Sequence, residues 1–210
     1  VVRCFEDQNV VHVDGKVDPA ADIETINTEL ILRDLDTVEK RLDRARRMAK
    51  GNDAEAKATV SLCERLLSAF NAGQRAVHVK PDDEREAAVL ADLQLLTDKP
   101  MFYVANVKEE QLASAATDPL VAKVREVAAR EGTTVDVICA AIEAEIMQLS
   151  DAERPDFLQS VGLTEPSLNA VIRTGYSALD MITFFTAGKK EVRAWTIQKG
   201  DKAPRAAGKI

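Results

Sequence analysis

Two stretches of the chain carry apolar residues at the spacing of a coiled coil. The apolar positions alternate in steps of three and four from Ile31 to Phe70, with a break at Gly51-Asn52-Asp53. They are Ile31, Leu35, Val38, Leu42, Ala45 and Ala49 before the break, and Ala56, Val60, Cys63, Leu67 and Phe70 after it. Asp18-Pro19 marks the start of the first helix, as an N-cap followed by proline at the first helical position. Neither helix can bury such a narrow seam alone, so the pattern predicts two antiparallel helices that form a projecting arm.

Continuous apolar runs of strand length occur in the rest of the chain. These runs are Val1–Phe5, Val10–Val13, Met101–Ala105 and Val135–Ile138. A helix predicted from Asp118-Pro119 to Gly132 separates the last two runs, and strand, helix and strand at this distance form a βαβ unit. The two strands should therefore be parallel, and their continuous apolarity fits a sheet that is covered on both faces. The predicted fold class is α/β.

Three more helices and a final strand are predicted by the same signals. The helices cover Asp82–Leu96, Ala141–Leu149 and the residues after Pro166, and Ser150 and Glu153 have the spacing of a capping box. The last helix carries Leu168, Val171, Ile172, Tyr176 and Leu179 on one side. Residues 191–197 alternate like a half-exposed strand, which predicts the start of a separate small β-containing domain.

Composition limits the classes of partner. The 210 residues, of which 46% are apolar, suffice for one large domain or two small ones. The 28 Lys and Arg against 35 Asp and Glu give a net charge of −7, which argues against coating nucleic acid by bulk charge but leaves room for a local basic patch. No stretch approaches the ~20 consecutive apolar residues of a membrane span, so no membrane partner is expected.

Cysteine and histidine usage points to a reducing compartment without a metal centre. The three cysteines are Cys4, Cys63 and Cys139. They lie far apart and form no CxxC pair, which predicts a cytoplasmic location and no structural metal site. His12 and His78 are isolated, so neither is expected to be catalytic. The chain opens inside one apolar run and stops soon after another strand pattern, so we expect a segment of a longer protein.

Candidate chemistry lies where the two predicted parallel strands end. Asn106-Val107-Lys108-Glu109 follows the first strand, and Cys139-Ala140-Ala141 follows the second. Ligands of open parallel sheets bind beyond the carboxyl ends of the strands. An amide side chain could read the edge of a base there, and small residues would let a flat ring approach the backbone. The residues alone leave a second interpretation open, in which Asn106 only forms a turn and 139–141 only pack.

Two longer motifs carry a resemblance. The first is Phe5-Glu6-Asp7 … His12-Val13-Asp14-Gly15 … Val17-Asp18-Pro19 … Asp22-Ile23-Glu24 … Ile26-Asn27-Thr28-Glu29-Leu30, and the second is Phe185-Thr186-Ala187-Gly188 with Glu191-Val192-Arg193-Ala194-Trp195. In these motifs the chain resembles the YchF (Obg-like ATPase) family of translation-factor-class P-loop NTPases, over essentially all 210 residues and in order.

The resemblance implies a domain organisation. Residues 1–35 and 80–182 would form the latter part of a nucleotide-binding domain with the parallel sheet of a P-loop NTPase. Residues 36–79 would be an inserted antiparallel two-helix coiled-coil arm, and residues 183–210 the beginning of a small β-grasp-like TGS domain.

The resemblance also assigns the first strand-end loop a role in base recognition. Asn106-Val107-Lys108-Glu109 matches the NxxE motif of the family, and related GTPases carry Asp at the position of Glu109. That Asp accepts two hydrogen bonds from N1 and N2 of guanine, and adenine has no donor at either atom. A longer Glu side chain is misplaced for this pair, so ATP is expected to be preferred over GTP. Val107 would approach adenine through its backbone, while Asn106 holds the loop and the N7 side of the ring.

The second loop matches the other base-contacting segment of the family. Relatives begin it with Ser or Thr, so Cys139 departs from the pattern. This departure favours contact with the base through the backbone of Cys139, Ala140 and Ala141.

The parts that would carry hydrolysis are not in this sequence. It contains no GxxxxGK[ST] phosphate loop, and phosphate loop and switch regions hold the phosphates, Mg²⁺ and the hydrolytic water. The resemblance therefore implies an ATPase that uses ATP and Mg²⁺ when intact. This segment alone is expected to be inactive, with no catalytic residue of its own.

Six basic residues crowd the distal half of the first arm helix. They are Lys40, Arg41, Arg44, Arg46, Arg47 and Lys50. One interpretation is a solvated face with acidic partners one turn away. The other is a contact with RNA or the ribosome, since a net-acidic chain that gathers positive charge at a projecting tip suits a phosphate backbone.

Three functions remain open at this stage. The leading hypothesis is a ribosome-associated ATPase; the alternative is a nucleotide-gated module that binds RNA or the ribosome, with hydrolysis secondary. A coiled-coil scaffold that binds no nucleotide is the third, and the two strand-end loops argue against it. The sequence leaves the oligomeric state open.

Overall fold

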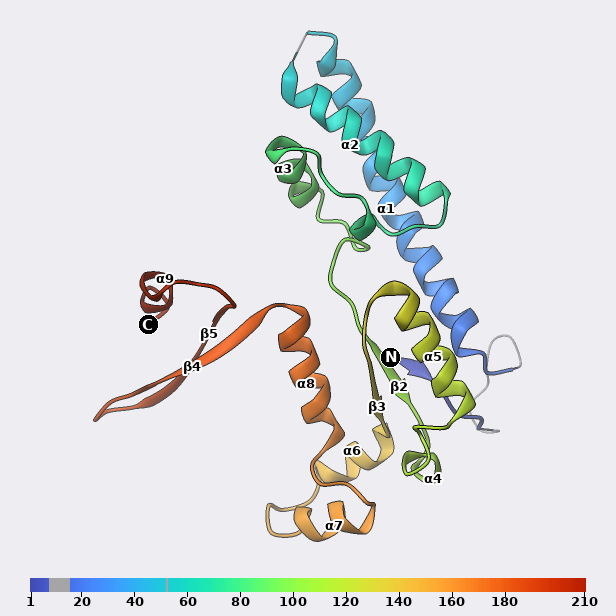
Figure 1. The fold of residues 1–210 in the computed structure, drawn as a ribbon, viewed down its shortest axis with the longest axis vertical. Coiled ribbons are helices and arrows are strands. Elements are labelled where there is room, and N and C mark those ends of the chain that lie inside the picture. Colours follow the sequence, from blue (N-terminus) through green and yellow to red (C-terminus); the bar gives the residue numbers. More distant parts are fainter. Residues whose placement is uncertain (8–15, 52) are drawn as a thin grey trace. The chain divides into compact units, whose positions relative to one another are not determined.

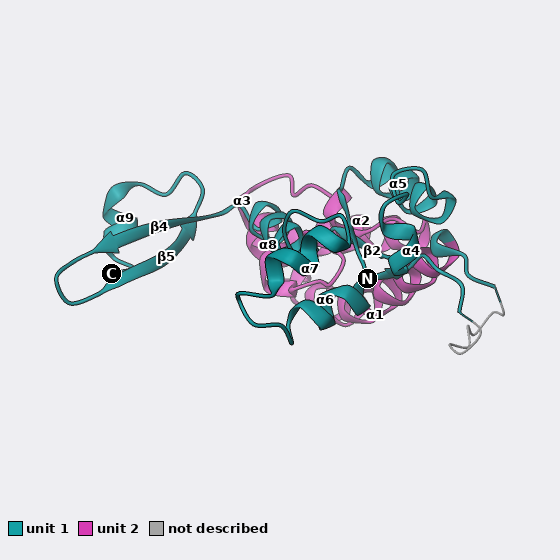
Figure 2. Ribbon diagram, turned by 90° about the horizontal axis from the view of Figure 1, so that it is seen from below, with its two compact units in different colours: residues 1–20, 101–210 teal, residues 21–100 magenta. Residues whose placement is uncertain are grey.

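The computed structural model describes residues 1–7, 16–51 and 53–210, and it divides into two compact units (Figures 1 and 2). One unit comprises residues 1–20 and 101–210, and the other comprises residues 21–100. The strand predicted at Val10–Val13, its following turn and His12 lie outside the described residues.

The first unit contains the predicted parallel sheet. Its strands are β1 (Val2–Arg3), β2 (Tyr103–Asn106) and β3 (Val135–Ile138), in the order β1-β2-β3. Both pairings are parallel, with Val2 opposite Ala105 and Tyr103 opposite Val135. The prediction of a parallel βαβ unit is therefore confirmed, although β2 begins two residues later than the apolar run.

The crossover helix α5 (Pro119–Glu131) ends where its local signals predict. Oδ1 of Asp118 accepts hydrogen bonds from the backbone N–H of Leu120 and Val121 at 2.8 and 3.1 Å. The helix closes at Gly132, whose φ of 68° is unfavourable for a residue with a Cβ. Val121 and Val124 are fully buried, so this helix covers the sheet with its predicted apolar side.

Short helices and a hairpin complete the first unit. They are α4 (Glu109–Leu112), α6 (Ala140–Ile146), α7 (Arg154–Ser160), α8 (Ser167–Ala178), β4 (Met181–Ala187), β5 (Val192–Gln198) and α9 (Ala203–Ala207). Strands β4 and β5 pair antiparallel, with Phe184 opposite Trp195. Before α7, the Glu153 carboxylate accepts hydrogen bonds from both N–H and Oγ of Ser150, so only the Glu side of the predicted capping box forms.

The second unit is helical. It is built from α1 (Pro19–Ala49), which starts in the first unit, and from α2 (Ala54–Asn71), the 3₁₀ turn η1 (Ala76–His78) and α3 (Glu84–Leu93). Helices α1 and α2 run antiparallel (Figure 1). Val38 on α1 and Cys63 on α2 are fully buried. The arm predicted for residues 36–79 lies inside this larger unit.

The buried face of α2 is wider than the seam that the sequence indicated. Leu62 and Leu66, which lie outside the seam, are fully buried, whereas Val60 and Leu67 are only partly buried. The reason is that α3 and Leu95 cover α2 as well, and join the same core. The sequence also extended α3 to Leu96, but the helix ends at Leu93, and the next residue, Gln94, adopts a left-handed conformation with φ 47°.

Candidate functional site

The two strand-end loops are bonded directly to each other. Oδ1 of Asn106 accepts a hydrogen bond from the backbone N–H of Ala140 at 3.0 Å. The N–H of Val107 donates to the carbonyl oxygen of Ile138 at 2.9 Å. The parallel register, which pairs Asn106 with Ile138, produces this contact. The loops therefore form one continuous edge beyond the carboxyl ends of β2 and β3.

The predicted site residues present different groups to solvent. Val107 and Cys139 are each 2% exposed, so their side chains are buried. Ala140 and Ala141 are exposed at the start of α6, and Glu109 is exposed as the first residue of α4. A ligand that lay against these loops would meet backbone, two methyl groups and a carboxylate, and not the thiol of Cys139.

Sequence reasoning missed Gln111, whose side chain holds the first loop. Its Oε1 accepts a hydrogen bond from the N–H of Lys108 at 3.0 Å, and its Nε2 donates to the carbonyl of Cys4 at 3.2 Å and to Oδ2 of Asp118 at 2.8 Å. One signal was available. Gln111 is the third residue of α4, the position from which Glu or Gln returns to the N-cap backbone.

The six basic residues, five of them on α1 and Lys50 directly after it, fall into two groups. Lys40 pairs with Asp36 at 2.7 Å, Arg41 with Asp92 at 3.2 Å and Arg46 with Glu64 at 2.9 Å. The Lys40 hydrogen bond also lowers the pKa of Asp36.

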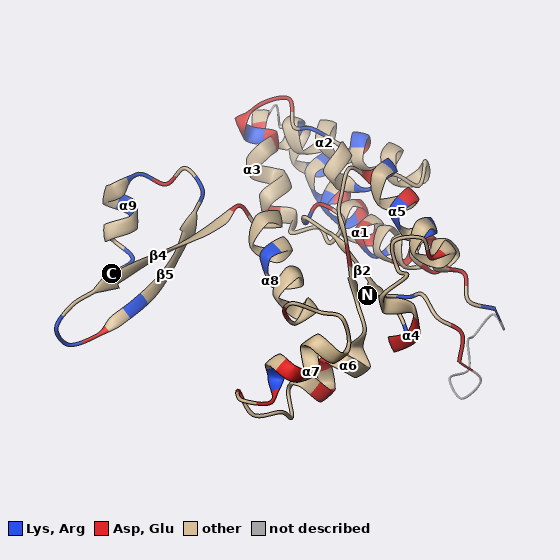
Figure 3. Ribbon diagram, turned by 60° about the horizontal axis from the view of Figure 1, so that its bottom comes forward, with Lys and Arg blue, Asp and Glu red and all other residues tan. Residues whose placement is uncertain are grey.

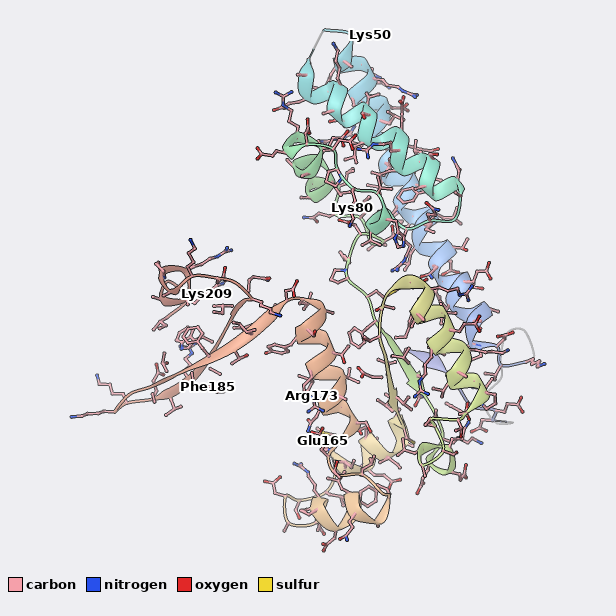
Figure 4. The ribbon with its side chains drawn as sticks, viewed as in Figure 1. Lys50, Lys80, Glu165, Arg173, Phe185 and Lys209 are labelled. Atoms are coloured by element: carbon pink, nitrogen blue, oxygen red, sulfur yellow. The ribbon has the colours of Figure 1, made fainter. Side chains whose placement is uncertain are left out.

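The remaining three basic residues are Arg44, Arg47 and Lys50. They are exposed, and none has an ion pair within the described residues. Lys50 lies at the end of the helical pair where α1 stops (Figure 4). Sequence spacing could not separate these three from the others, because two of the neutralising carboxylates come from α2 and α3.

Two cavities that the described residues line lie away from the strand-end loops. One, of about 230 Å³, lies between α1 and α2 and is lined by Arg41, Arg44 and Asp53 among others. The other, of about 630 Å³, is lined by α8 and the start of β4, with Ile172, Tyr176 and Ile182 partly exposed. Neither of these two cavities is lined by the residues of the predicted base slot.

Arg173 on α8 forms an ion pair with Glu165, which lies just before the helix. The guanidinium of Arg173 donates to Glu165 at 2.5 and 3.1 Å, and Asn169 donates to the same carboxylate at 3.0 Å (Figure 4). These bonds, the Arg173 bond foremost, lower the pKa of Glu165 from 4.5 to about 2.

The described residues carry no candidate metal cluster and no candidate membrane-spanning helix. No three of their His, Cys, Asp or Glu side chains are grouped so as to hold a metal ion. No described helix combines the length and the apolar character needed to cross a membrane.

Several known proteins align with essentially the whole chain. The "Ribosome-binding ATPase YchF" of Escherichia coli O157:H7 is 51% identical over 212 aligned positions, and that of Bacillus subtilis is 48% identical over 210; both matches cover 100% of this chain and 57% of the relative. The structure titled "Structure of the Schizosaccharomyces pombe YchF GTPase" superposes with a TM-score of 0.83 at 31% identity, covering 99% of this chain and 56% of that one.

A family model supports the same relationship at the end of the chain. The model described as "YchF-GTPase_C: Protein of unknown function (DUF933)" matches residues 181–210. The chain spans a little more than half the length of the curated relatives that it matches. These matches and the shared parallel α/β fold show that the chain is similar over its whole length to proteins of the YchF family.

Proposed function

We propose that these residues are part of a ribosome-associated P-loop NTPase that binds and hydrolyses ATP in preference to GTP, and that they contribute its base-recognition loops. The printed names of the relatives support ribosome association and nucleotide hydrolysis, but one says ATPase and another GTPase. The base preference therefore has to be argued from the loops themselves. A ribosome-associated protein would work in the cytoplasm.

One observation carries the proposal: the side chain of Asn106 joins the two loops through the N–H of Ala140 at 3.0 Å. This bond holds both loops at one sheet edge, where open parallel sheets bind their ligands. The Asn106 carboxamide then lies where it can face one edge of a purine. The backbone of 139–141 can approach its ring, since Ala140 and Ala141 add only methyl groups.

The residue that would select the base is Glu109. Guanine is recognised by a carboxylate that takes hydrogen bonds from N1 and N2 together, and such charge-assisted pairs are about twice as strong as neutral ones. The extra methylene of Glu109 moves its carboxylate out of the position that an Asp would occupy. Adenine offers no donor at these atoms and loses nothing, so adenine is favoured.

Glu109→Asp tests this assignment. We expect the substitution to raise the affinity for GTP relative to ATP by about tenfold, since one bidentate base contact is worth ~1–3 kcal/mol of discrimination. Fluorescent ATP and GTP analogues titrated into the intact protein measure the ratio, since these 210 residues contain no phosphate loop. Glu110→Asp, one residue further along the same helix, is the matched control. An unchanged ratio in the Glu109 variant would remove Glu109 as the selecting residue.

A second candidate function is a nucleotide-gated RNA- or ribosome-binding module in which hydrolysis is secondary. Two features favour it. The first is the set of free cations at the end of α1, namely Arg44 and Arg47 on the helix and Lys50 directly after it. The second is charge distribution: residues 181–210 hold seven Lys and Arg against two Asp and Glu, a charge of +5, within a chain of −7. Figure 3 shows the basic residues at the tip of the β4–β5 hairpin, on β5 and near α9.

Charge reversal in each of the two groups of arm cations tests whether the free cations carry ribosome binding. The variant with Arg44, Arg47 and Lys50 changed to Glu should lose ribosome co-sedimentation, because these cations are free to meet phosphates. The variant with Lys40, Arg41 and Arg46 changed to Glu has the same net charge and is the control; it should lose less. Equal losses would show that bulk charge, and not the free cations, carries the interaction. ATP turnover of the intact protein with and without ribosomes then shows whether hydrolysis or binding is the main activity.

A further inference from the structure

The amide of Gln111 ties the first strand-end loop to two other parts of its unit. Its three hydrogen bonds reach the N–H of Lys108 inside the loop, the carbonyl of Cys4 after β1, and the carboxylate of Asp118 before α5. Cys4 in turn donates its N–H to the carbonyl of Asn106 at 2.8 Å. The first strand-end loop is therefore held by hydrogen bonds on the β1 side as well as on the β3 side.

The chemistry of this position requires an amide. Nε2 uses both of its hydrogens, on one carbonyl and one carboxylate, and Oε1 accepts from an N–H. A Glu would lose both donors and would place a second carboxylate against Asp118. A Met of similar length would lose all three bonds. The neighbours also decide the orientation of the amide, because two acceptors face Nε2 and a donor faces Oε1.

The Lys108 bond acts on the residue proposed to select the base. The N–H of Lys108 belongs to the peptide that joins Val107 to Lys108, and the next residue is Glu109, the first residue of α4. Oε1 of Gln111 therefore holds the backbone from which the Glu109 carboxylate projects. Asp118 is itself held, since its other oxygen caps α5. Through Asp118, Gln111 thereby links the loop to the start of the crossover helix α5.

We propose that Gln111 is a positioning residue for base selection: its amide sets where the Glu109 carboxylate lies, and so sets the discrimination between adenine and guanine. This inference rests on the proposed function of the strand-end loops. Gln111 itself need not touch the nucleotide, since its donors and acceptor are already occupied.

The test compares Gln111→Glu and Gln111→Met with Gln159→Glu, a change at an exposed glutamine of α7. Hydrogen exchange of the Lys108 amide in the full chain measures the hydrogen bond directly. Titration with fluorescent ATP and GTP analogues measures selectivity, and thermal unfolding shows whether each variant is folded.

We expect both Gln111 variants to lose protection at Lys108 and to reduce the ATP-to-GTP affinity ratio several-fold, with Gln159→Glu like the unmodified chain. A residue with a merely structural role would lower the unfolding temperature and leave the ratio unchanged. Unchanged Lys108 exchange, or an unchanged ratio despite faster exchange, overturns the inference while the base site stands. If the intact protein with an unmodified sequence binds neither analogue, the base site itself falls, and the role of Gln111 falls with it.

Discussion

Asp34 is a carboxylate buried to 2% exposure within the helical unit, and its oxygens are fully used. It accepts hydrogen bonds from the N–H of Leu96 at 2.8 Å, and from the N–H and Oγ1 of Thr97 at 2.7 Å each. Oγ1 of Thr97 then accepts from the N–H of Ala76 at 3.0 Å. A buried charge is tolerated here because the segment after α3 supplies donors to it.

Asp34→Ala should destabilise the chain by about 3 kcal/mol, because it leaves buried N–H groups of Leu96 and Thr97 without an acceptor. Asp34→Asn should cost less, since one acceptor oxygen remains. Urea unfolding measures both changes. Asp43→Ala, at an exposed position of the same helix, is the control and should stay within about 0.5 kcal/mol. Equal changes in the free energy of unfolding at both positions would mean that the hydrogen bonds to Asp34 do not stabilise the chain.

Glu165 links stability to pH. Its pKa falls to about 2 in the folded chain, chiefly through its hydrogen bond with Arg173. A depressed carboxyl pKa stabilises the fold above the unfolded value near 4.5, and this contribution is lost as the pH falls towards 2.

Glu165→Gln should therefore lower the unfolding temperature slightly at pH 7, and the difference should shrink as the pH falls from about 4.5 to 2. The effect is small because the pair is exposed to water. Thermal unfolding of both proteins across this pH range measures it. Glu126→Gln, an exposed change on α5, controls for the loss of one negative charge. A difference that grows on acidification contradicts the assignment.

At the scale of elements, local signals predicted where helices begin and end better than how wide their buried faces are. Asp118, Pro119 and Gly132 bound α5 because capping depends on neighbouring residues. The apolar seam of α2 was predicted from the spacing of apolar residues alone. This spacing cannot show that α3 packs against a second side of the helix.

Leu62 tests the wider face of α2. Leu62→Ala should cost about 2–5 kcal/mol, as for a fully buried leucine in a packed core. Leu32→Ala, at a leucine of α1 that is 59% exposed, should change the free energy of unfolding by no more than about 0.5 kcal/mol. Denaturant unfolding compares them. A cost at Leu62 as small as that at Leu32 would mean that α3 does not pack on α2 as described.

At the scale of the whole molecule, the chain contains the loops proposed to recognise the base but no phosphate loop. The sequence contains no GxxxxGK[ST] motif, and such loops cradle the phosphates during hydrolysis. We expect the 210 residues alone to release no phosphate from ATP above the uncatalysed background. A phosphate-release assay measures this, with a GxxxxGK[ST]-containing ATPase as the positive control. Turnover above background would place catalytic groups in this chain and overturn the division of labour proposed here.

Much of the candidate site could be predicted from the sequence alone. Asn106–Glu109 and Cys139–Ala141 were found because they follow predicted strands, and the parallel pairing that brings them together follows from the βαβ rule. Gln111 was not found, because its partners Cys4 and Asp118 lie 107 and 7 positions away and no spacing rule connects all three.

The sequence by itself determined the α/β class, both ends of α5, the parallel strands and the two loops at their carboxyl ends. Each of these follows from periodicity or capping, which act over a few neighbouring residues. Only the tertiary structure decided which arm cations are free, how much of α2 is buried and which side chain holds the first loop. Those outcomes depend on contacts between residues far apart in the chain, and such contacts exist only once the elements have packed.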